Sequence, residues 1–164
     1  MEAEPLVIVL VDDKEKHLEV ISRLLEETKE FRTIQIEYTE NMQIDGNLLS
    51  FEDYNYYLLD LILVDTREEE EKDIKEKLSV ILATTILAKN PKAKIGFYTT
   101  GRNQFEQDRL QEEIPGSEVM LFRMRMITAR NGENPEQDEA KRRVAISREE
   151  HRDMVRNFIN NGVL

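Results

Sequence analysis

Two adjacent aspartates, Asp12 and Asp13, directly follow an apolar run, Leu6–Val11. Neighbouring carboxylates repel each other and are costly to remove from water unless a cation or hydrogen bonds offset their charge. A third aspartate, Asp65, ends a second apolar stretch, YLLDLILVD. We expect the three carboxylates to meet at one edge of a sheet, where a hard divalent cation such as Mg²⁺ would neutralise them.

Asp60 lies in the same apolar stretch as Asp65 and has to be distinguished from it. If the whole stretch is one strand, five residues at about 3.3 Å each separate the two aspartates by roughly 16 Å. They would then lie at opposite ends of the strand. We therefore predict that Asp65, and not Asp60, lies beside Asp12 and Asp13.

Short apolar runs alternate with longer stretches of helical period, which is typical of an α/β protein with a mostly parallel sheet. Residues 128–145 contain Asn, Gly and Pro, and we predict an insertion or an extended hairpin there. The predicted strands are residues 6–11, 32–38, 57–65, 93–100 and 118–127. The predicted helices are residues 14–28, 67–90 and 104–114, a short one within 39–56, and a last helix capped by Ser147.

This order predicts a single domain, residues 1–164, with a doubly wound, five-stranded parallel sheet between two layers of helices. In such a sheet, ligands bind beyond the carboxyl ends of the strands. Besides the three aspartates, the predicted strand ends contain Thr99, Thr100 and, late in the fifth strand, Arg123. These side chains are the candidate site.

Charge and composition limit the classes of function. The 164 residues include 34 acidic and 23 basic side chains, and the net charge of -11 disfavours binding to nucleic acids or anionic membranes. Without cysteine, the chain has no disulfide, thiolate metal site or cysteine nucleophile. No apolar run reaches the roughly 20 residues that span a bilayer, and the acidic start MEAEP is unlike a signal peptide. We expect a cytoplasmic protein.

The sequence resembles the receiver domains of bacterial two-component response regulators. The resemblance covers about Leu6 to Val163 and is carried by four motifs in a fixed order. They are VLVDD at Val9–Asp13, DLILVD at Asp60–Asp65, YTT at Tyr98–Thr100, and AISREEHRDMV in the last helix. The resemblance implies the flavodoxin-like receiver fold, with three layers in the order α/β/α.

The resemblance also implies a role for each acidic residue. Asp65 would be the phosphoacceptor, whose carboxylate attacks the phosphorus of a kinase's phosphohistidine and becomes an acyl phosphate. Asp12, Asp13 and Asp65, with the backbone carbonyl of Arg67, would hold the Mg²⁺ that shields the phosphoryl charge.

Thr99 matches the family's hydroxyl residue that moves to bind the phosphoryl oxygens, and Thr100 occupies its small-residue position. Arg123 stands where receivers have a lysine followed by a proline. Arginine keeps the positive charge but carries it on a planar guanidinium group. Met120 replaces the aromatic residue three positions earlier, and TREEE replaces the usual Met-Pro pair after the phosphoacceptor. These departures affect how a signal would leave the domain.

The two histidines, His17 and His151, each lack a second histidine at metal-ligand spacing. We therefore predict that both are surface or packing residues.

Three classes of function fit these residues. The first is a stand-alone receiver, phosphorylated by a histidine kinase or phosphotransfer protein, that signals by contact with a downstream protein. The second is a degenerate receiver that binds proteins independently of phosphorylation. The third is a Mg²⁺-dependent phosphohydrolase, disfavoured because Arg67 stands where many such enzymes have a second acid. Acidic helix faces and a basic carboxyl-terminal end fit a homodimer or a monomer.

Overall fold

The computed structural model describes residues 4–39, 51–64, 66–100, 107–124 and 137–160. Five strands form one parallel sheet in the order β2-β1-β3-β4-β5. The strands are β1 (Leu6–Asp12), β2 (Phe31–Glu37), β3 (Tyr56–Asp60), β4 (Lys94–Thr99) and β5 (Glu118–Leu121). The α-helices are α1 (Glu15–Glu26), α2 (Arg67–Glu71), α3 (Leu78–Lys89), α4 (Gln107–Glu113) and α6 (Gln137–Asn160), with 3-10 turns η2 (Phe51–Asp53) and η3 (Ile74–Glu76).

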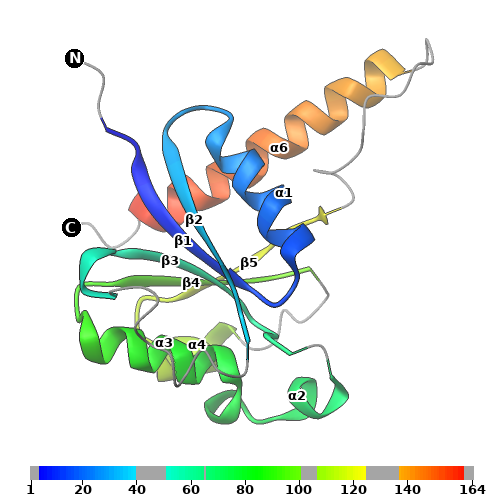
Figure 1. Cartoon of the computed structure of the whole chain (residues 1–164). Helices are drawn as coiled ribbons and strands as arrows, with labels where there is room; N and C mark the ends of the chain where they lie inside the picture. Colours follow the sequence, from blue (N-terminus) through cyan, green and yellow to red (C-terminus); the bar gives the residue numbers. More distant parts are fainter. Residues whose placement is uncertain (1–3, 40–50, 65, 101–106, 125–136, 161–164) are drawn as a thin grey trace.

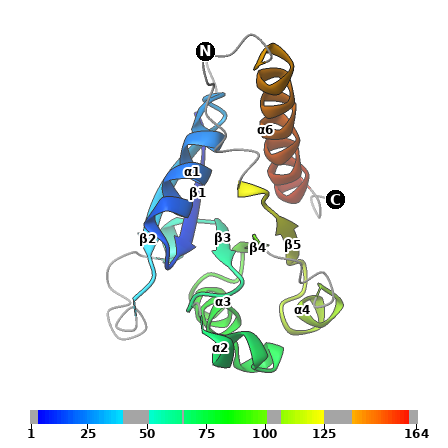
Figure 2. The same cartoon turned by 90° about the vertical axis from the view of Figure 1, so that its right-hand side faces the viewer.

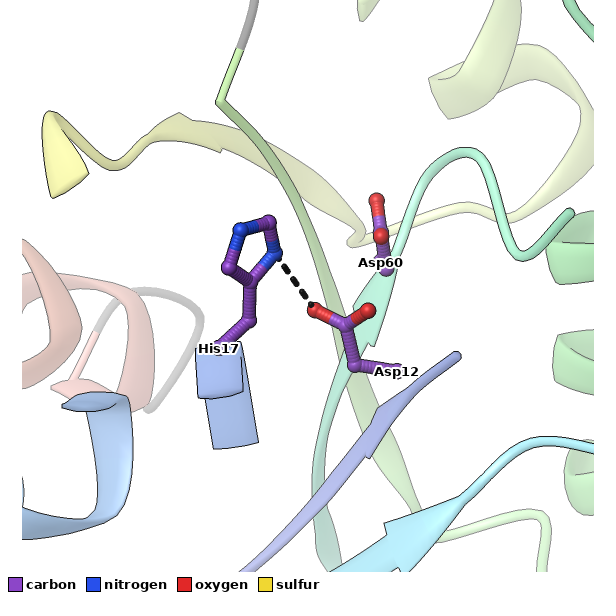
Figure 3. A group of neighbouring side chains, drawn as sticks. All are labelled: Asp12, His17 and Asp60. Carbon is purple, nitrogen blue, oxygen red and sulfur yellow. Dashed lines mark ion pairs between the residues drawn. The ribbon is translucent and has the colours of Figure 1, made fainter. Parts of the chain in front are cut away.

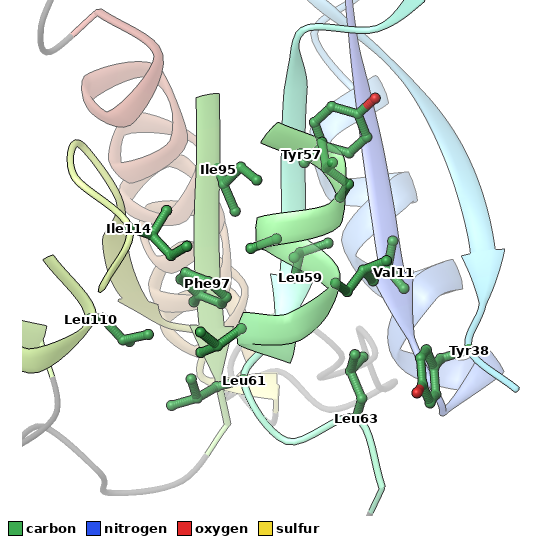
Figure 4. Packing of buried hydrophobic residues seen from close by; sticks show 14 of the residues in the cluster. Val11, Tyr38, Tyr57, Leu59, Leu61, Leu63, Ile95, Phe97, Leu110 and Ile114 are labelled. Carbon is green, nitrogen blue, oxygen red and sulfur yellow. The ribbon is translucent and has the colours of Figure 1, made fainter. Parts of the chain in front are cut away.

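The sheet lies between two layers of helices (Figures 1 and 2). On one face, α1 and α6 bury apolar side chains such as Leu18 and Phe158 against β1, β3 and β4. On the other face, α3 and α4 pack side chains such as Ala83 and Leu110 against the same strands (Figure 4). The predicted fold class, a doubly wound three-layer α/β/α sheet, is confirmed.

The strand register brings the carboxyl ends together at one edge. Val11 of β1 pairs with Leu59 of β3, which pairs with Phe97 of β4. The residues that follow each of these, including Asp12 and Asp60, therefore lie at the same edge of adjacent strands. The order of connection reverses between β1 and β3, which is the position where doubly wound sheets bind ligands.

The predicted helix over residues 67–90 is wrong as a single element. The chain forms α2, then η3, and then α3, because Lys77 and Glu69 are buried between them. Lys77 Nζ donates to the carbonyls of Glu69 at 3.3 Å and Glu70 at 2.9 Å, at the end of α2. Glu69 Oε1 accepts the Leu78 N–H at 2.9 Å at the start of α3. These bonds satisfy backbone groups that a continuous helix would have paired itself.

Two predictions about the carboxyl-terminal third also need correction. The fifth strand ends at Leu121 instead of residue 127, and α6 begins at Gln137 instead of near Ser147. Residues 137–145 of the predicted insertion are therefore helical, and Figure 1 shows this end of α6 extending past the sheet. Residues 128–136, and the short helix predicted in 39–56 except for η2, lie outside the described residues.

Within the described residues, no helix is both long enough and apolar enough to cross a membrane.

Candidate functional site

Asp12 is the last residue of β1, and its side chain is fully buried. Its Oδ1 accepts the backbone N–H of Lys14 at 2.9 Å, and its Oδ2 accepts the hydroxyl of Tyr98 at 2.6 Å. Tyr98 belongs to β4, two strands away, and is itself fully buried. Hydrogen bonds to an ionised carboxylate are short and strong. They hold the Asp12 carboxylate at the carboxyl edge of the sheet.

Asp60 is the last residue of β3 and lies at the same edge as Asp12. Its backbone pairs with Tyr98, and its Oδ1 accepts the backbone N–H of Ile62 at 3.1 Å. The prediction that Asp60 lies at the far end of the strand is therefore wrong. The strand begins at Tyr56 and stops at Asp60, so the apolar residues after Asp60 are not part of it.

Those residues are apolar for a different reason. Leu61 and Leu63 are buried in the core cluster under α3 (Figure 4), and the carbonyl of Leu61 accepts the Ser79 hydroxyl at 2.7 Å. Asp65, the predicted phosphoacceptor, lies outside the described residues. Arg67, whose carbonyl was predicted to bind the metal, begins α2, and its exposed side chain pairs with Glu71 at 2.8 Å.

Asp13 follows Asp12 immediately and is half-buried. Its Oδ1 is buried and has no hydrogen-bond partner among the described residues. Both aspartates thus lie at the end of the first strand, as predicted. The Asp12 side chain is buried, and the Asp13 side chain is half-buried next to it.

Thr99 is the last residue of β4 and is buried, while Thr100 is exposed beyond the strand. The carbonyl of Thr99 accepts the N–H of Phe122 at 2.9 Å, which ties β4 to the end of β5. Arg123 follows β5 instead of lying within it, and it is exposed. Its backbone N–H donates to Nε2 of His151 at 2.9 Å.

His151 is a packing residue, as predicted. Its ring stacks on Phe122 with centroids 5.6 Å apart. Because the Ser147 carbonyl, 2.6 Å from Nδ1, can only accept, Nδ1 carries the proton and Nε2 is free to accept from Arg123. The neutral ring therefore connects α6 to the chain after β5.

His17, which we predicted to be a surface or packing residue, lies at the carboxyl edge of the sheet. It belongs to the first turn of α1, and its Nδ1 is 3.3 Å from Oδ2 of Asp12. Figure 3 shows His17, Asp12 and Asp60 converging from α1, β1 and β3. One ligand atom from each of the three residues lies within 4.8 Å of the others.

The negative charges of this cluster are poorly offset. Burial raises the pKa of Asp60 to about 9, and the charge of Asp12 contributes to the shift. Burial, together with the neighbouring Asp12, also raises the pKa of Asp13 to about 6. The same burial and the Asp12 carboxylate raise the pKa of the Tyr98 hydroxyl, which keeps it protonated as a donor.

A divalent cation fits this donor set. Buried carboxylates with raised pKa values gain most from a nearby positive charge, and the unpartnered Asp13 Oδ1 offers a further acceptor. Asp12, Asp13 and Asp60 are oxygen donors of the kind that Mg²⁺ prefers.

No family model matches the sequence, and no curated protein matches it. The fold, however, matches solved structures. A response regulator from Thermotoga maritima is 10% identical, with a TM-score of 0.51, and the match covers 86% of this chain and 98% of that one. This is the fold of response-regulator receiver domains.

Two further solved structures share the fold. RcsB from Salmonella enterica serovar Typhimurium, solved bound to promoter rprA with a phosphomimetic BeF3-, is 17% identical, with a TM-score of 0.52 over 84% of this chain and 74% of that one. A Burkholderia pseudomallei response regulator with a phosphorylated aspartic acid, a calcium ion and citrate is 14% identical, with a TM-score of 0.50 over 84% of this chain and 72% of that one.

The sequence analysis did not place two residues of this edge of the sheet, Asp60 and His17. Strands most often have five or six residues, so a strand beginning near Tyr56 would have ended near Asp60. His17 lies in the first turn of a helix that starts at the same edge as Asp12, and such a position places a side chain near the strand end. The usual length of a strand could therefore have pointed to Asp60, and the position of His17 in the first helical turn could have pointed to His17.

We predict that Asp60→Asn stabilises the metal-free protein at alkaline pH. The folded pKa of Asp60, about 9, lies above its unfolded value, so the wild type loses stability as the pH rises through this range. A neutral amide removes that loss, which we expect to amount to several kcal/mol over the range, at about 1.4 kcal/mol for each pH unit. Urea unfolding in EDTA from pH 4 to 9 would measure it. A difference between variant and wild type that does not grow with pH would contradict the prediction.

Proposed function

We propose that the protein is a cytoplasmic, receiver-like signalling protein, phosphorylated on Asp60 in a Mg²⁺-dependent reaction. The phosphoryl donor would be a histidine kinase or phosphotransfer protein, and the signal would pass on by protein contact. One observation carries the proposal: Asp60 ends the central strand β3 beside the buried Asp12. The receiver fold places its phosphoacceptor at the end of this strand, so the role implied for Asp65 moves to Asp60.

The reaction uses the Asp60 carboxylate as nucleophile and an external phosphohistidine as the phosphoryl donor. An Asp60 carboxylate oxygen attacks the phosphorus of a phosphohistidine, and an O–P bond forms as the P–N bond breaks. The electron pair of the P–N bond returns to the imidazole nitrogen of the donor. The product is an acyl phosphate on Asp60, which water later hydrolyses.

Mg²⁺ would shield the charge of the incoming phosphoryl group. Asp12, Asp13 and Asp60 would hold it, with the backbone carbonyl two residues after the phosphoacceptor, which is that of Ile62. A cation would also displace the proton that the raised pKa keeps on Asp60 near neutral pH. Only the ionised carboxylate is nucleophilic, so phosphorylation is expected to depend on the metal.

Thr99 is the proposed switch residue because it is buried at the end of β4, the strand next to β3. Thr100 would occupy the small-residue position after it. The hydrogen bond from the Arg123 N–H to His151 holds the backbone of Arg123, and its exposed side chain would supply a positive charge to the phosphoryl group.

The test is intact-mass analysis of the wild-type protein after incubation with acetyl phosphate and Mg²⁺. We expect the gain of one phosphoryl group that hydroxylamine removes, and no gain when EDTA replaces Mg²⁺. The control is the same protein after treatment with Mg²⁺ alone. No gain from acetyl phosphate, phosphoramidate or a phosphorylated histidine kinase would overturn the proposal.

That negative result would favour a second function, a phosphorylation-independent protein-binding module. The hydrogen bond between the Tyr98 hydroxyl and Asp12 Oδ2 favours it, because a buried donor already occupies one carboxylate oxygen at the site. The exposed position of Arg123 agrees with it.

A further inference from the structure

His17 adds a nitrogen ligand to a carboxylate site. Its Nδ1 atom is buried and has no hydrogen-bond partner among the described residues, although Asp12 Oδ2 is only 3.3 Å away. The contact is close but poorly directed for a hydrogen bond. Asp12 Oδ2 is the ion-pair partner of this nitrogen, as Figure 3 shows.

The spacing of these atoms suits a metal ion. Ligands at about 2.0–2.1 Å around a tetrahedral Zn²⁺ lie about 3.3 Å from one another, which is the observed separation of His17 Nδ1 and Asp12 Oδ2. A carboxylate oxygen of Asp60 completes the group, in which one ligand atom from each residue lies within 4.8 Å of the others. Asp12 is anchored by hydrogen bonds from the Lys14 N–H and the Tyr98 hydroxyl, and Asp60 by one from the Ile62 N–H, so the group is held in place. Each carboxylate oxygen keeps a second lone pair that can bind a metal ion.

The donor types favour a different metal from Mg²⁺. Mg²⁺ prefers oxygen ligands and retains waters, whereas imidazole suits Zn²⁺ and other first-row transition metals. Three protein ligands with an open position are the arrangement of catalytic zinc sites.

We propose that Asp12, His17 and Asp60 bind a first-row transition metal ion, with Zn²⁺ as the test case, more tightly than Mg²⁺. The inference rests on the proposed function in that it uses the same two carboxylates as the Mg²⁺ site. It adds the identity of the metal, through a histidine ligand that the proposed function does not use.

The test is isothermal titration of the full chain with Zn²⁺ and, separately, with Mg²⁺. The variants are His17→Gln and, as a matched control, Glu15→Gln, which removes an exposed carboxylate from the same turn of α1.

We expect wild type to prefer Zn²⁺ and His17→Gln to bind Zn²⁺ at least about 10-fold more weakly, since even the loss of a group that supports a ligand costs this much. Mg²⁺ affinity should change less than about threefold, because Mg²⁺ prefers oxygen ligands. Glu15→Gln should match wild type for both metals.

An unchanged Zn²⁺ affinity in His17→Gln would overturn the inference, as would an equal loss for Zn²⁺ and Mg²⁺, which would indicate a structural role for His17. Failure here is distinguishable from failure of the proposed function. Phosphorylation with Mg²⁺ but no His17-dependent Zn²⁺ binding would reject only the transition-metal site. His17-dependent Zn²⁺ binding without any phosphorylation would reject only the phosphoacceptor.

Discussion

Asp60→Asn is expected to abolish phosphorylation by acetyl phosphate, and Asp65→Asn to leave it at the level of the wild type. Asparagine cannot form an acyl phosphate, so the loss at the true phosphoacceptor is complete. The expectation follows from the end of β3 at Asp60, beside the buried Asp12. Intact-mass analysis of the three proteins in Mg²⁺ would measure it.

The two variants control for each other, because each removes one carboxylate from the same apolar stretch. Loss in Asp65→Asn with retention in Asp60→Asn would instead support the assignment made from sequence alone. Misfolding would not explain a loss in Asp60→Asn, because removing a buried carboxylate with a raised pKa is expected to stabilise the metal-free protein. Circular dichroism and a melting curve would check the fold of each variant.

Asp12→Asn is expected to remove at least about half of the stabilisation that Mg²⁺ gives the wild type. A ligand that binds only the folded state raises the free energy of unfolding by about 2.7 kcal/mol at 100 times its dissociation constant. Asparagine can still accept from Lys14, and its size preserves the packing near Tyr98, but it lacks the charge that attracts the cation. A tenfold loss of affinity would reduce the stabilisation by about 1.4 kcal/mol.

Thermal unfolding with and without Mg²⁺ would measure this effect. The matched control is Glu37→Gln, because Glu37 pairs with Asp12 at the end of the neighbouring strand β2 but is exposed and outside the cluster. It removes the same charge from the same edge. An equal reduction in both variants would mean that Mg²⁺ responds to the general negative charge of this edge and not to a site at Asp12.

The sequence by itself determined the class of fold and one half of the site. Alternating apolar runs and helical stripes are local patterns that burial imposes on each segment, so they predicted the doubly wound sheet. The pair Asp12 and Asp13 directly ends the first of these runs, and the structure places both at the carboxyl edge. The helix 67–90 was less predictable, because Lys77 and Glu69 break it through contacts between residues far apart in the segment.

Only the tertiary structure decided which aspartate stands beside Asp12. An apolar run records burial and not strand conformation. Leu61 and Leu63 are buried under α3 after the strand has ended, so the run YLLDLILVD is longer than β3. Where a strand ends depends on pairing with neighbours distant in sequence, here Val11 with Leu59 and Asp60 with Tyr98. The local turn from β1 into α1 places His17 beside Asp12, but only the pairing of β1 with β3 brings Asp60 to the same edge.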